Sequence, residues 1–238
     1  MTETVCGAEI EYEYNSFMRP DGNDGAIIFL HGWGGDLRSF KGAFNTAESC
    51  GLKAVNYAFP KTVPSEWGIY DYSAQLNSFL QAKKLTNPIL VGHSFGGRVS
   101  IILASQRVCS KLVLVDSAGL KPRFNLRKKI AIARYKSHVR RGKPLDGFGS
   151  VDYNNLSSDM RKVFVRIVNT HLDRLLGYID CPTLIVWGKD DIDTPPYMAR
   201  RLHRGIANSK LEFIDGGHYA YVQSAFGFNR ILKSFLTE

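Results

Sequence analysis

The fold is decided by the stretch Pro88-Ile89-Leu90-Val91-Gly92-His93-Ser94-Phe95-Gly96-Gly97, in which an apolar run of strand type meets the pattern Gly-x-Ser-x-Gly. Helix-forming sequence follows it. A strand that turns this sharply into a helix needs small residues two positions before and after the serine, because larger side chains would clash there. The turn exposes the Ser94 hydroxyl with a helix N-terminus behind it. A glycine-rich structural turn or a phosphate-binding loop is the alternative, and no Gly-Lys-Ser/Thr follows to hold a nucleotide.

Outward from this turn, short β-rich runs alternate with segments of helical length, without repeats or low-complexity linkers. The inner runs are continuously apolar, as expected of strands covered by helices on both faces. We therefore predict an α/β fold with a mostly parallel, doubly wound sheet. The expected strands are 8–14, 26–30, 53–57, 88–92, 111–116, 183–188 and 210–214, and the clearest expected helices are 72–83, 98–105 and 225–236.

The alternation of strands and helices is interrupted once, after the strand that ends at Asp116. The segment 119–178 has helical patterns around 124–141 and over 158–176 but no convincing strand. We expect it to be a small helical cap inserted late in the sheet, with 1–118 and 179–238 forming the core domain. Ligands of open α/β sheets bind at the carboxyl edge of the strands, which such a cap can cover.

The net charge of +9 is concentrated in this same region. Residues 121–178 hold 14 basic and 4 acidic side chains, a net +10, and the rest of the chain holds 17 and 18, a net −1. This segment is either a solvated basic face or a surface that attracts an anionic substrate or an acidic protein partner. No nucleic-acid-binding signature accompanies it, so a nucleic-acid partner is not expected.

A second glycine cluster, His31-Gly32-Trp33-Gly34-Gly35, follows the expected strand 26–30. Its backbone can approach a reacting carbonyl closely, which suits an oxyanion hole. The amides of Trp33 and Phe95 are the natural donor pair, and one such donor is worth about 3–4 kcal/mol in the transition state.

A nucleophilic serine needs a base, and the base needs a carboxylate that fixes its tautomer. Of the six histidines, only His218 lies in a loop directly after a late strand, in Asp-Gly-Gly-His. The acid is sought in Trp-Gly-Lys-Asp-Asp, where we favour Asp191 over Asp190 because adjacent residues in a tight loop point apart. Asp116 and Asp193 remain alternatives.

With these motifs in this order, the sequence resembles the α/β-hydrolase superfamily over nearly its whole length. The resemblance implies Ser94 as nucleophile, Asp191 as acid, His218 as base, Trp33 and Phe95 as oxyanion hole, and 121–178 as the helical cap. Relatives that attack with an aspartate are excluded by Ser94. The expected activity is cleavage of carboxylic esters through an acyl-enzyme, on a small-molecule ester, without metal or organic cofactor.

Two subtypes of the superfamily and one non-enzymatic role stay open. The His-Gly-Trp-Gly loop and basic cap are similar to those of the carboxylesterase that acts on an acyl group held by an acidic carrier protein. Hydrolases of carbon-carbon bonds in ring-fission products usually carry Trp after the catalytic histidine, where this chain has Tyr219. A ligand-binding pseudo-hydrolase or receptor would keep the pocket without turnover.

We expect neither a secretory signal nor a membrane span in this sequence. Its start lacks a basic segment followed by an apolar one, and no apolar run reaches the roughly 18–20 residues that span a bilayer. The four cysteines (Cys6, Cys50, Cys109 and Cys181) form no metal-binding spacing, and we expect reduced, mostly buried thiols in a cytoplasmic protein.

Overall fold

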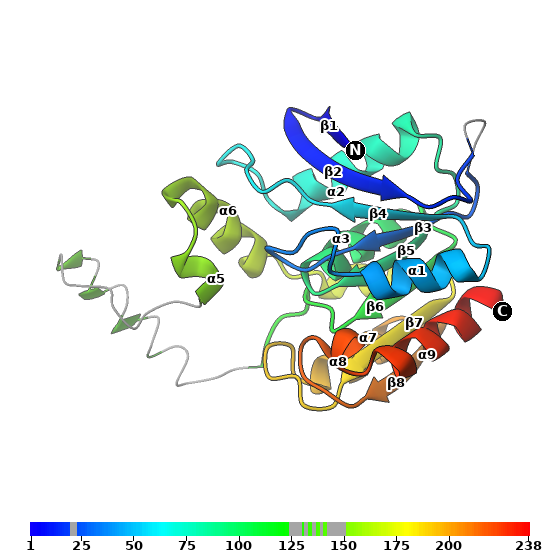
Figure 1. Ribbon diagram of the computed structural model, residues 1–238. Helices are drawn as coiled ribbons and strands as arrows, with labels where there is room; N and C mark the ends of the chain where they lie inside the picture. The colour runs from blue at the N-terminus through cyan, green and yellow to red at the C-terminus, as the bar shows by residue number, and fades with distance from the viewer. Residues whose placement is uncertain (20–22, 124–129, 131–132, 135–136, 139, 142–150) are drawn as a thin grey trace.

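The computed structural model describes residues 1–19, 23–123, 130, 133–134, 137–138, 140–141 and 151–238 (Figure 1). Within these residues, the strands of the sheet are β1 (Thr2–Val5), β2 (Ala8–Tyr14), β3 (Ile27–Leu30), β4 (Ala54–Ala58), β5 (Ile89–His93), β6 (Lys111–Val115), β7 (Thr183–Gly188) and β8 (Ser209–Ile214). The helices are α1 (Lys41–Ser49), α2 (Ile69–Ala82), α3 (Phe95–Ser105), α5 (Val151–Asn154), α6 (Ser158–Asn169), the 3-10 helix η1 (Asp173–Tyr178), α7 (Tyr197–Gly205), α8 (Ala220–Gln223) and α9 (Ala225–Thr237).

The strands form one mixed sheet in the order β1-β2-β4-β3-β5-β6-β7-β8. The hairpin β1–β2 is antiparallel and also pairs antiparallel with β4, whereas β4, β3, β5, β6, β7 and β8 run parallel. Parallel strands end at the same edge, so the loops after β3, β5, β7 and β8 meet there. The expected α/β sheet is confirmed, and this edge is where its site should lie.

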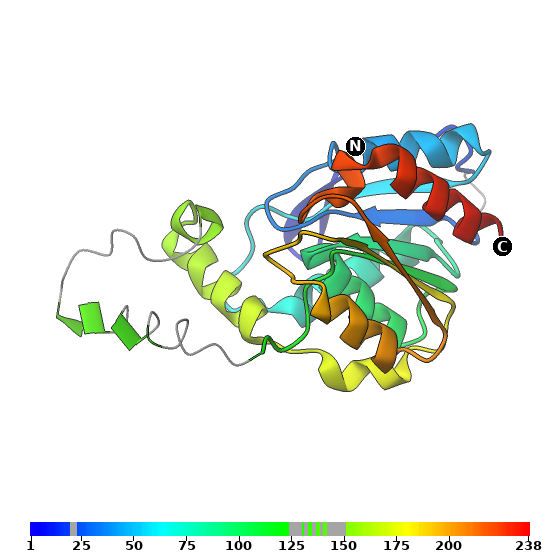
Figure 2. The same ribbon diagram turned by 90° about the horizontal axis from the view of Figure 1, so that it is seen from below.

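Helices cover both faces of the sheet, which explains why the inner strands are apolar throughout. One core joins the sheet to α1, α8 and α9, and the other joins it to α2, α3, α6, η1 and α7. Figure 2 shows α1 and α9 on one side and α3 and α7 on the other. Trp187, Phe29 and Phe79 are completely buried, and each such side chain contributes about 1.5–3 kcal/mol to folding.

The connection between β6 and β7 contains α5, α6 and η1. Both views place α5 and α6 beyond the carboxyl ends of the parallel strands (Figures 1 and 2). The inner face of α6 (Met160, Val163 and Ile167) joins the core on the α3 side of the sheet, as do Leu172 and Leu176. Most of the expected basic helix over 124–141 lies outside the described residues, so the cap with bounds 119–178 stays a prediction.

The structure corrects three details of the sequence-based predictions. The strand β1 was not predicted, because it is a short edge strand whose burial does not alternate cleanly. The helical run over 158–176 is two elements, since α6 ends at Asn169 and η1 begins at Asp173. All four cysteines are free, but only Cys109 is buried, and Cys6 is exposed at a positive φ of 51° in the β1–β2 turn.

No helix among the described residues combines the length and the apolar character needed to cross a membrane.

Candidate active site

Ser94 lies in the turn between β5 and α3, and its backbone is held in an unusual conformation. Its φ is 48° and its ψ is −105°, a strained geometry for a residue with a side chain. The Ser94 amide donates to the carbonyl of Val115 at 3.1 Å, and the Ser94 carbonyl accepts from the amide of Ala118 at 3.1 Å. These two bonds, to the last residue of β6 and to the segment after it, fix the turn and present the serine side chain at the carboxyl edge.

The glycines on either side of Ser94 are needed because other chain segments approach them closely. A β-carbon at Gly92 would lie 2.6 Å from the carbonyl oxygen of Gly96 and 2.5 Å from the Ser100 hydroxyl. A β-carbon at Gly96 would collide with the carbonyl of Leu30. Small residues are needed two positions before and after the serine because β5, α3 and β3 approach one another closely there.

The structure brings Ser94, His218 and Asp191 into one hydrogen-bonded chain. The Ser94 Oγ lies 3.0 Å from Nε2 of His218, and Nδ1 of His218 lies 2.9 Å from Oδ2 of Asp191. The three residues follow β5, β8 and β7, so their closeness is a consequence of parallel strands ending together. The Asp191 side chain is fully buried and the His218 side chain is 13% exposed, so the imidazole remains partly accessible.

Asp191 is held as a carboxylate by several donors. Its Oδ1 accepts the amides of Asp193 at 2.8 Å and Thr194 at 2.9 Å, and its Oδ2 accepts the Thr194 hydroxyl at 2.6 Å in addition to His218. Burial opposes its ionisation, but the hydrogen bonds from His218 and Thr194 prevail and keep the pKa of the Asp191 carboxyl below its ordinary value. A charged Asp191 makes His218 carry its proton on Nδ1 and leaves Nε2 free to face Ser94.

The alternative acids occupy different positions. Asp190 and Asp193 are exposed, and Asp116 is buried with its Oδ1 accepting the amide of Gly188 at 2.7 Å. Asp191 is the acid that contacts His218.

The expected pair of oxyanion-hole donors lies on two segments, with Trp33 after β3 and Phe95 at the start of α3. Neither the amide of Trp33 nor that of Phe95 donates a hydrogen bond to another described group, so both N–H groups are available. The two side chains pack edge to face with ring centroids 5.3 Å apart. A β-carbon at Gly32 would lie 2.7 Å from Nδ1 of His93, so the loop approaches the Ser94 turn as closely as glycine allows.

Two buried histidines, His31 and His93, support these loops. His31 donates from Nδ1 to the carbonyl of Gly32 at 2.6 Å and accepts the amide of Phe59 on Nε2 at 3.0 Å. His93 donates from Nε2 to the main-chain carbonyl of His218 at 2.8 Å. Burial, with the nearby His218, lowers the pKa of His93 to about 3, so His93 stays neutral and acts only as a donor.

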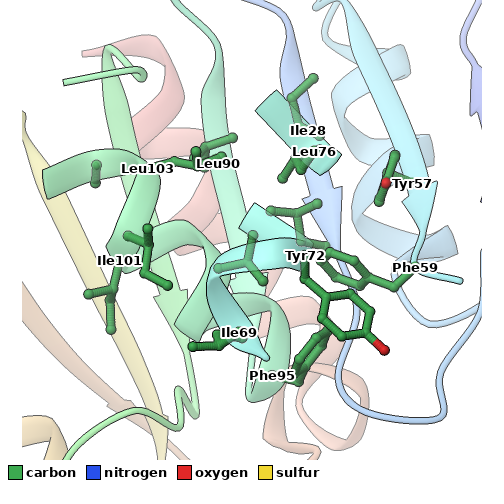
Figure 3. Packing of buried hydrophobic residues seen from close by; sticks show 14 of the residues in the cluster. Ile28, Tyr57, Phe59, Ile69, Tyr72, Leu76, Leu90, Phe95, Ile101 and Leu103 are labelled. Carbon is green, nitrogen blue, oxygen red and sulfur yellow. The ribbon is translucent and has the colours of Figure 1, made fainter. Parts of the chain in front are cut away.

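Aromatic side chains surround the serine turn. Tyr72 packs on Phe95 at 5.0 Å between ring centroids, Phe59 packs on Phe95 at 4.9 Å, and Phe164 of α6 packs on Trp33 at 5.2 Å. Figure 3 shows the rings of Tyr72, Phe59 and Phe95 side by side, with the Tyr72 hydroxyl directed away from the other labelled side chains. That hydroxyl is buried and has no hydrogen-bond partner among the described residues.

Two arginines attach α6 to neighbouring parts of the fold by hydrogen bonds. Arg98 of α3 donates from Nη1 to the carbonyls of Ile167 at 3.0 Å and Thr170 at 2.7 Å, at the carboxyl end of α6. Arg166 of α6 donates to the carbonyls of Ser65 at 3.0 Å and Trp67 at 2.7 Å. Burial lowers the pKa of Arg98 to about 10, so it remains charged at neutral pH and complements the negative end of α6.

One group among the described residues has the composition of a cation site: Asp191, Asp193 and His218, with ligand atoms within 4.8 Å of one another. Two of its three members are bonded to each other through Nδ1 of His218 and Oδ2 of Asp191. A metal would have to displace this bond, so the arrangement favours proton transfer.

Sequence reasoning missed Thr194 and Arg98 and gave Asp116 only as an alternative acid. The spacing Asp-x-x-Thr over 191–194 was the available signal for Thr194, because such a residue can return its hydroxyl and amide to the acid. Nothing in the sequence indicates that Arg98 binds carbonyls of a segment some 70 residues away.

Fold and site together define a class of protein: a doubly wound α/β protein that presents serine, histidine and carboxylate at the carboxyl edge of its sheet. A model described as "Alpha/beta hydrolase family" matches residues 27–230, and the chain belongs to this family.

Individual relatives are distant. The chain is 25% identical to an AB hydrolase superfamily protein, YisY, of Bacillus subtilis over 92% of this chain and 94% of that one. A stretch of 62 residues, 26% of this chain and 22% of the relative, is 45% identical to a 2-hydroxy-6-oxononadienedioate/2-hydroxy-6-oxononatrienedioate hydrolase of Klebsiella pneumoniae. The solved structure of an esterase from Exiguobacterium antarcticum matches with a TM-score of 0.78 and 21% identity, covering 100% of this chain and 99% of that one.

Proposed function

We propose that this protein is a cytoplasmic serine hydrolase that cleaves carboxylic esters through an acyl-enzyme intermediate. The observation that carries the proposal is the hydrogen-bonded chain Ser94–His218–Asp191, at 3.0 and 2.9 Å. Both distances lie within the reach required for proton transfer between nucleophile and base.

The mechanism follows from the protonation states. Charged Asp191 holds the proton of His218 on Nδ1, so Nε2 accepts the Ser94 proton while Oγ attacks the ester carbonyl. The developing oxyanion is stabilised by the amides of Trp33 and Phe95. The His218 cation then protonates the departing alcohol, and the same imidazole activates the water that releases the acid.

The aromatic side chains around the serine turn support a substrate that carries an apolar group next to the scissile bond. Phe59, Tyr72, Phe95 and Phe164 pack around Trp33 and the serine turn, and we assign them the acyl or alcohol side of the substrate.

The basic segment supports an anionic substrate or an acidic partner at the cap. A hollow of about 730 Å³ along α6 is lined in part by Arg161, Lys162 and Arg166. Lys162 pairs with Asp159 at 2.8 Å, but Arg161 and Arg166 donate hydrogen bonds to main-chain carbonyls, and these contacts do not neutralise their charge.

A second candidate is hydrolysis of a carbon-carbon bond in a ring-fission product, favoured by the 45% identity to the Klebsiella pneumoniae hydrolase over 62 residues. The same nucleophile and base would serve it. Esters remain our first choice because the match is confined to about a quarter of the chain and Tyr219 departs from the Trp expected of that subtype.

The test is hydrolysis of p-nitrophenyl esters from acetate to octanoate by the wild type and by Ser94→Ala. We expect a rate that depends on Ser94 and shows a chain-length optimum. A half-ester with a free carboxylate, assayed at low and high salt, tests whether the basic cap attracts an anionic substrate. A preference for the anionic ester that salt weakens supports this attraction. An identical salt dependence for the anionic and the neutral ester contradicts it. If folded wild type cleaves no ester but cleaves a ring-fission dienoate, the second candidate is correct; if it cleaves neither, a ligand-binding role replaces both.

A further inference from the structure

Asp116, directly after β6, is a buried acid that the mechanism above does not use. Asp116 is completely buried, with 0% of its surface exposed. Its amide donates to the carbonyl of Val186 at 3.1 Å, and its Oδ1 accepts the amide of Gly188 at 2.7 Å. Its own carbonyl oxygen lies 3.1 Å from Oγ1 of Thr194. Asp116 is therefore tied to β7 and to the loop that carries Asp191.

The second carboxyl oxygen of Asp116 has no such partner. Oδ2 is buried and accepts no hydrogen bond from any described residue. The Asp191 carboxyl acts on the pKa of this carboxyl by its charge and by a side-chain hydrogen bond, and Asp116 acts in turn on the Tyr221 phenol of α8. The structure also brings the two acids together, because Oγ1 of Thr194 lies 3.1 Å from the Asp116 carbonyl oxygen and 2.6 Å from Oδ2 of Asp191. No lysine or arginine among the described residues pairs with it.

An ionised Asp116 would be untenable in these surroundings. Its charge would be buried, with one N–H group donating to its carboxyl oxygens, and a second carboxylate would lie beside it. Both conditions favour the neutral acid. Protonation converts Oδ2 from an orphaned acceptor into an O–H donor, and the adjacent carboxylate is its acceptor. One proton thus removes the like-charge repulsion and satisfies the buried oxygen.

We propose that Asp116 is a neutral carboxylic acid that donates a hydrogen bond from Oδ2 to the Asp191 carboxylate and thereby positions the acid of the Ser94–His218–Asp191 chain. This role rests on the proposed function, because it matters only if Asp191 serves His218. Asp116 touches neither substrate nor the reacting atoms, so it is a positioning residue. Thr194 cooperates with it, since its hydroxyl donates to Oδ2 of Asp191 at 2.6 Å while Oγ1 lies 3.1 Å from the Asp116 carbonyl oxygen.

The pKa of Asp116 agrees with this assignment. Burial, followed by the charge of Asp191, raises it to about 8 against the opposing effect of the Gly188 amide. The pKa values of Tyr221 and His93 are shifted away from this range, upward for the phenol and to about 3 for the imidazole, both by burial first. Near pH 8, Asp116 therefore loses its proton, the bond to Asp191 breaks, and two carboxylates repel each other behind His218.

The test compares Asp116→Asn with Asp116→Ala. Asparagine keeps an oxygen for the Gly188 amide and presents N–H to Asp191, so we expect kcat within about threefold of the wild type at pH 7. Alanine loses a hydrogen bond to a charged group, and we expect a loss of about 10- to 100-fold. The wild-type kcat should fall through pH 8, and the asparagine variant should lack this step. Circular dichroism and thermal unfolding check that both variants fold.

Direct titration of the carboxyl separates this inference from the proposed function. In Ser94→Ala protein with 13C-labelled aspartate, the carboxyl signal that Asp116→Asn removes should titrate near pH 8. If it does so while the wild type, with Ser94 in place, hydrolyses no ester, the neutral acid is supported and the ester-hydrolase proposal is overturned. If it titrates near its ordinary value of 3.8, or if Asp116→Asn loses as much activity as Asp116→Ala, the inference is wrong.

Discussion

Replacing Asp191 by asparagine should abolish most activity while leaving the site's shape intact, and the structure dictates how. Oδ1 of Asp191 accepts two main-chain amides, from Asp193 and Thr194. The oxygen of an asparagine must stay there, because its NH2 group would face two N–H donors if the side chain were flipped. The NH2 group therefore points at Nδ1 of His218 and at the Thr194 hydroxyl.

This orientation forces His218 into the wrong tautomer. Nδ1 becomes an acceptor, the ring proton moves to Nε2, and Nε2 can no longer take the proton of Ser94. We expect kcat to fall by about 10⁴, which corresponds to about 5 kcal/mol of transition-state stabilisation. KM for a small ester should change little, since Asp191 lies behind the imidazole and away from the substrate.

The assay is steady-state hydrolysis of the best p-nitrophenyl ester, with Asp190→Asn and Asp193→Asn as matched controls from the same loop. Both control residues are exposed, and we expect them to retain activity within about twofold. The reasoning is refuted if Asp191→Asn keeps more than a tenth of wild-type kcat, or if Asp190→Asn is the more damaging change. Thermal unfolding within a few degrees of the wild type ensures that the comparison concerns chemistry.

Two further changes test the surroundings of the site. Tyr72→Phe removes a buried hydroxyl that has no partner among the described residues. The free energy of unfolding in urea should therefore equal that of the wild type or exceed it by up to about 1 kcal/mol. A clear loss of stability would mean that the hydroxyl has a hydrogen-bond partner after all. Arg98→Met removes two charge-assisted bonds to the end of α6, so hydrogen exchange of α6 amides should accelerate about 10-fold or more while β5 and β6 stay protected, and uniform acceleration would contradict a local tether.

The parts of the molecule that sequence predicts well are those with local causes. The turn at Ser94 follows from two glycines at fixed spacing, and burial of both faces makes β5, β6 and β7 continuously apolar. His218 and Asp191 follow late strands, and the rule that parallel strands end at one edge is enough to bring them to Ser94.

Other features depend on contacts that no local pattern contains. The Asp116 carboxyl meets the amide of Gly188, 72 residues away, only because β6 and β7 pair. The break between α6 and η1 lies where Thr170 offers its carbonyl to Arg98, a contact across more than 70 positions. Strand β1 is held by its register with β2, such as Thr2 opposite Glu11, and its own side chains carry little hydrophobic signal.

The attachment of α6 has a consequence for which positions around it can be substituted. Arg98 and Arg166 grip main-chain oxygens, which every amino acid possesses. The acceptors therefore remain whatever side chain stands at positions 65, 67, 167 and 170, but Trp67 and Ile167 are also buried in the core, so Ser65 and Thr170 are the positions that can change. Substitutions at Ser65 and Thr170 should therefore leave α6 attached, because Arg98 and Arg166 keep their main-chain acceptors.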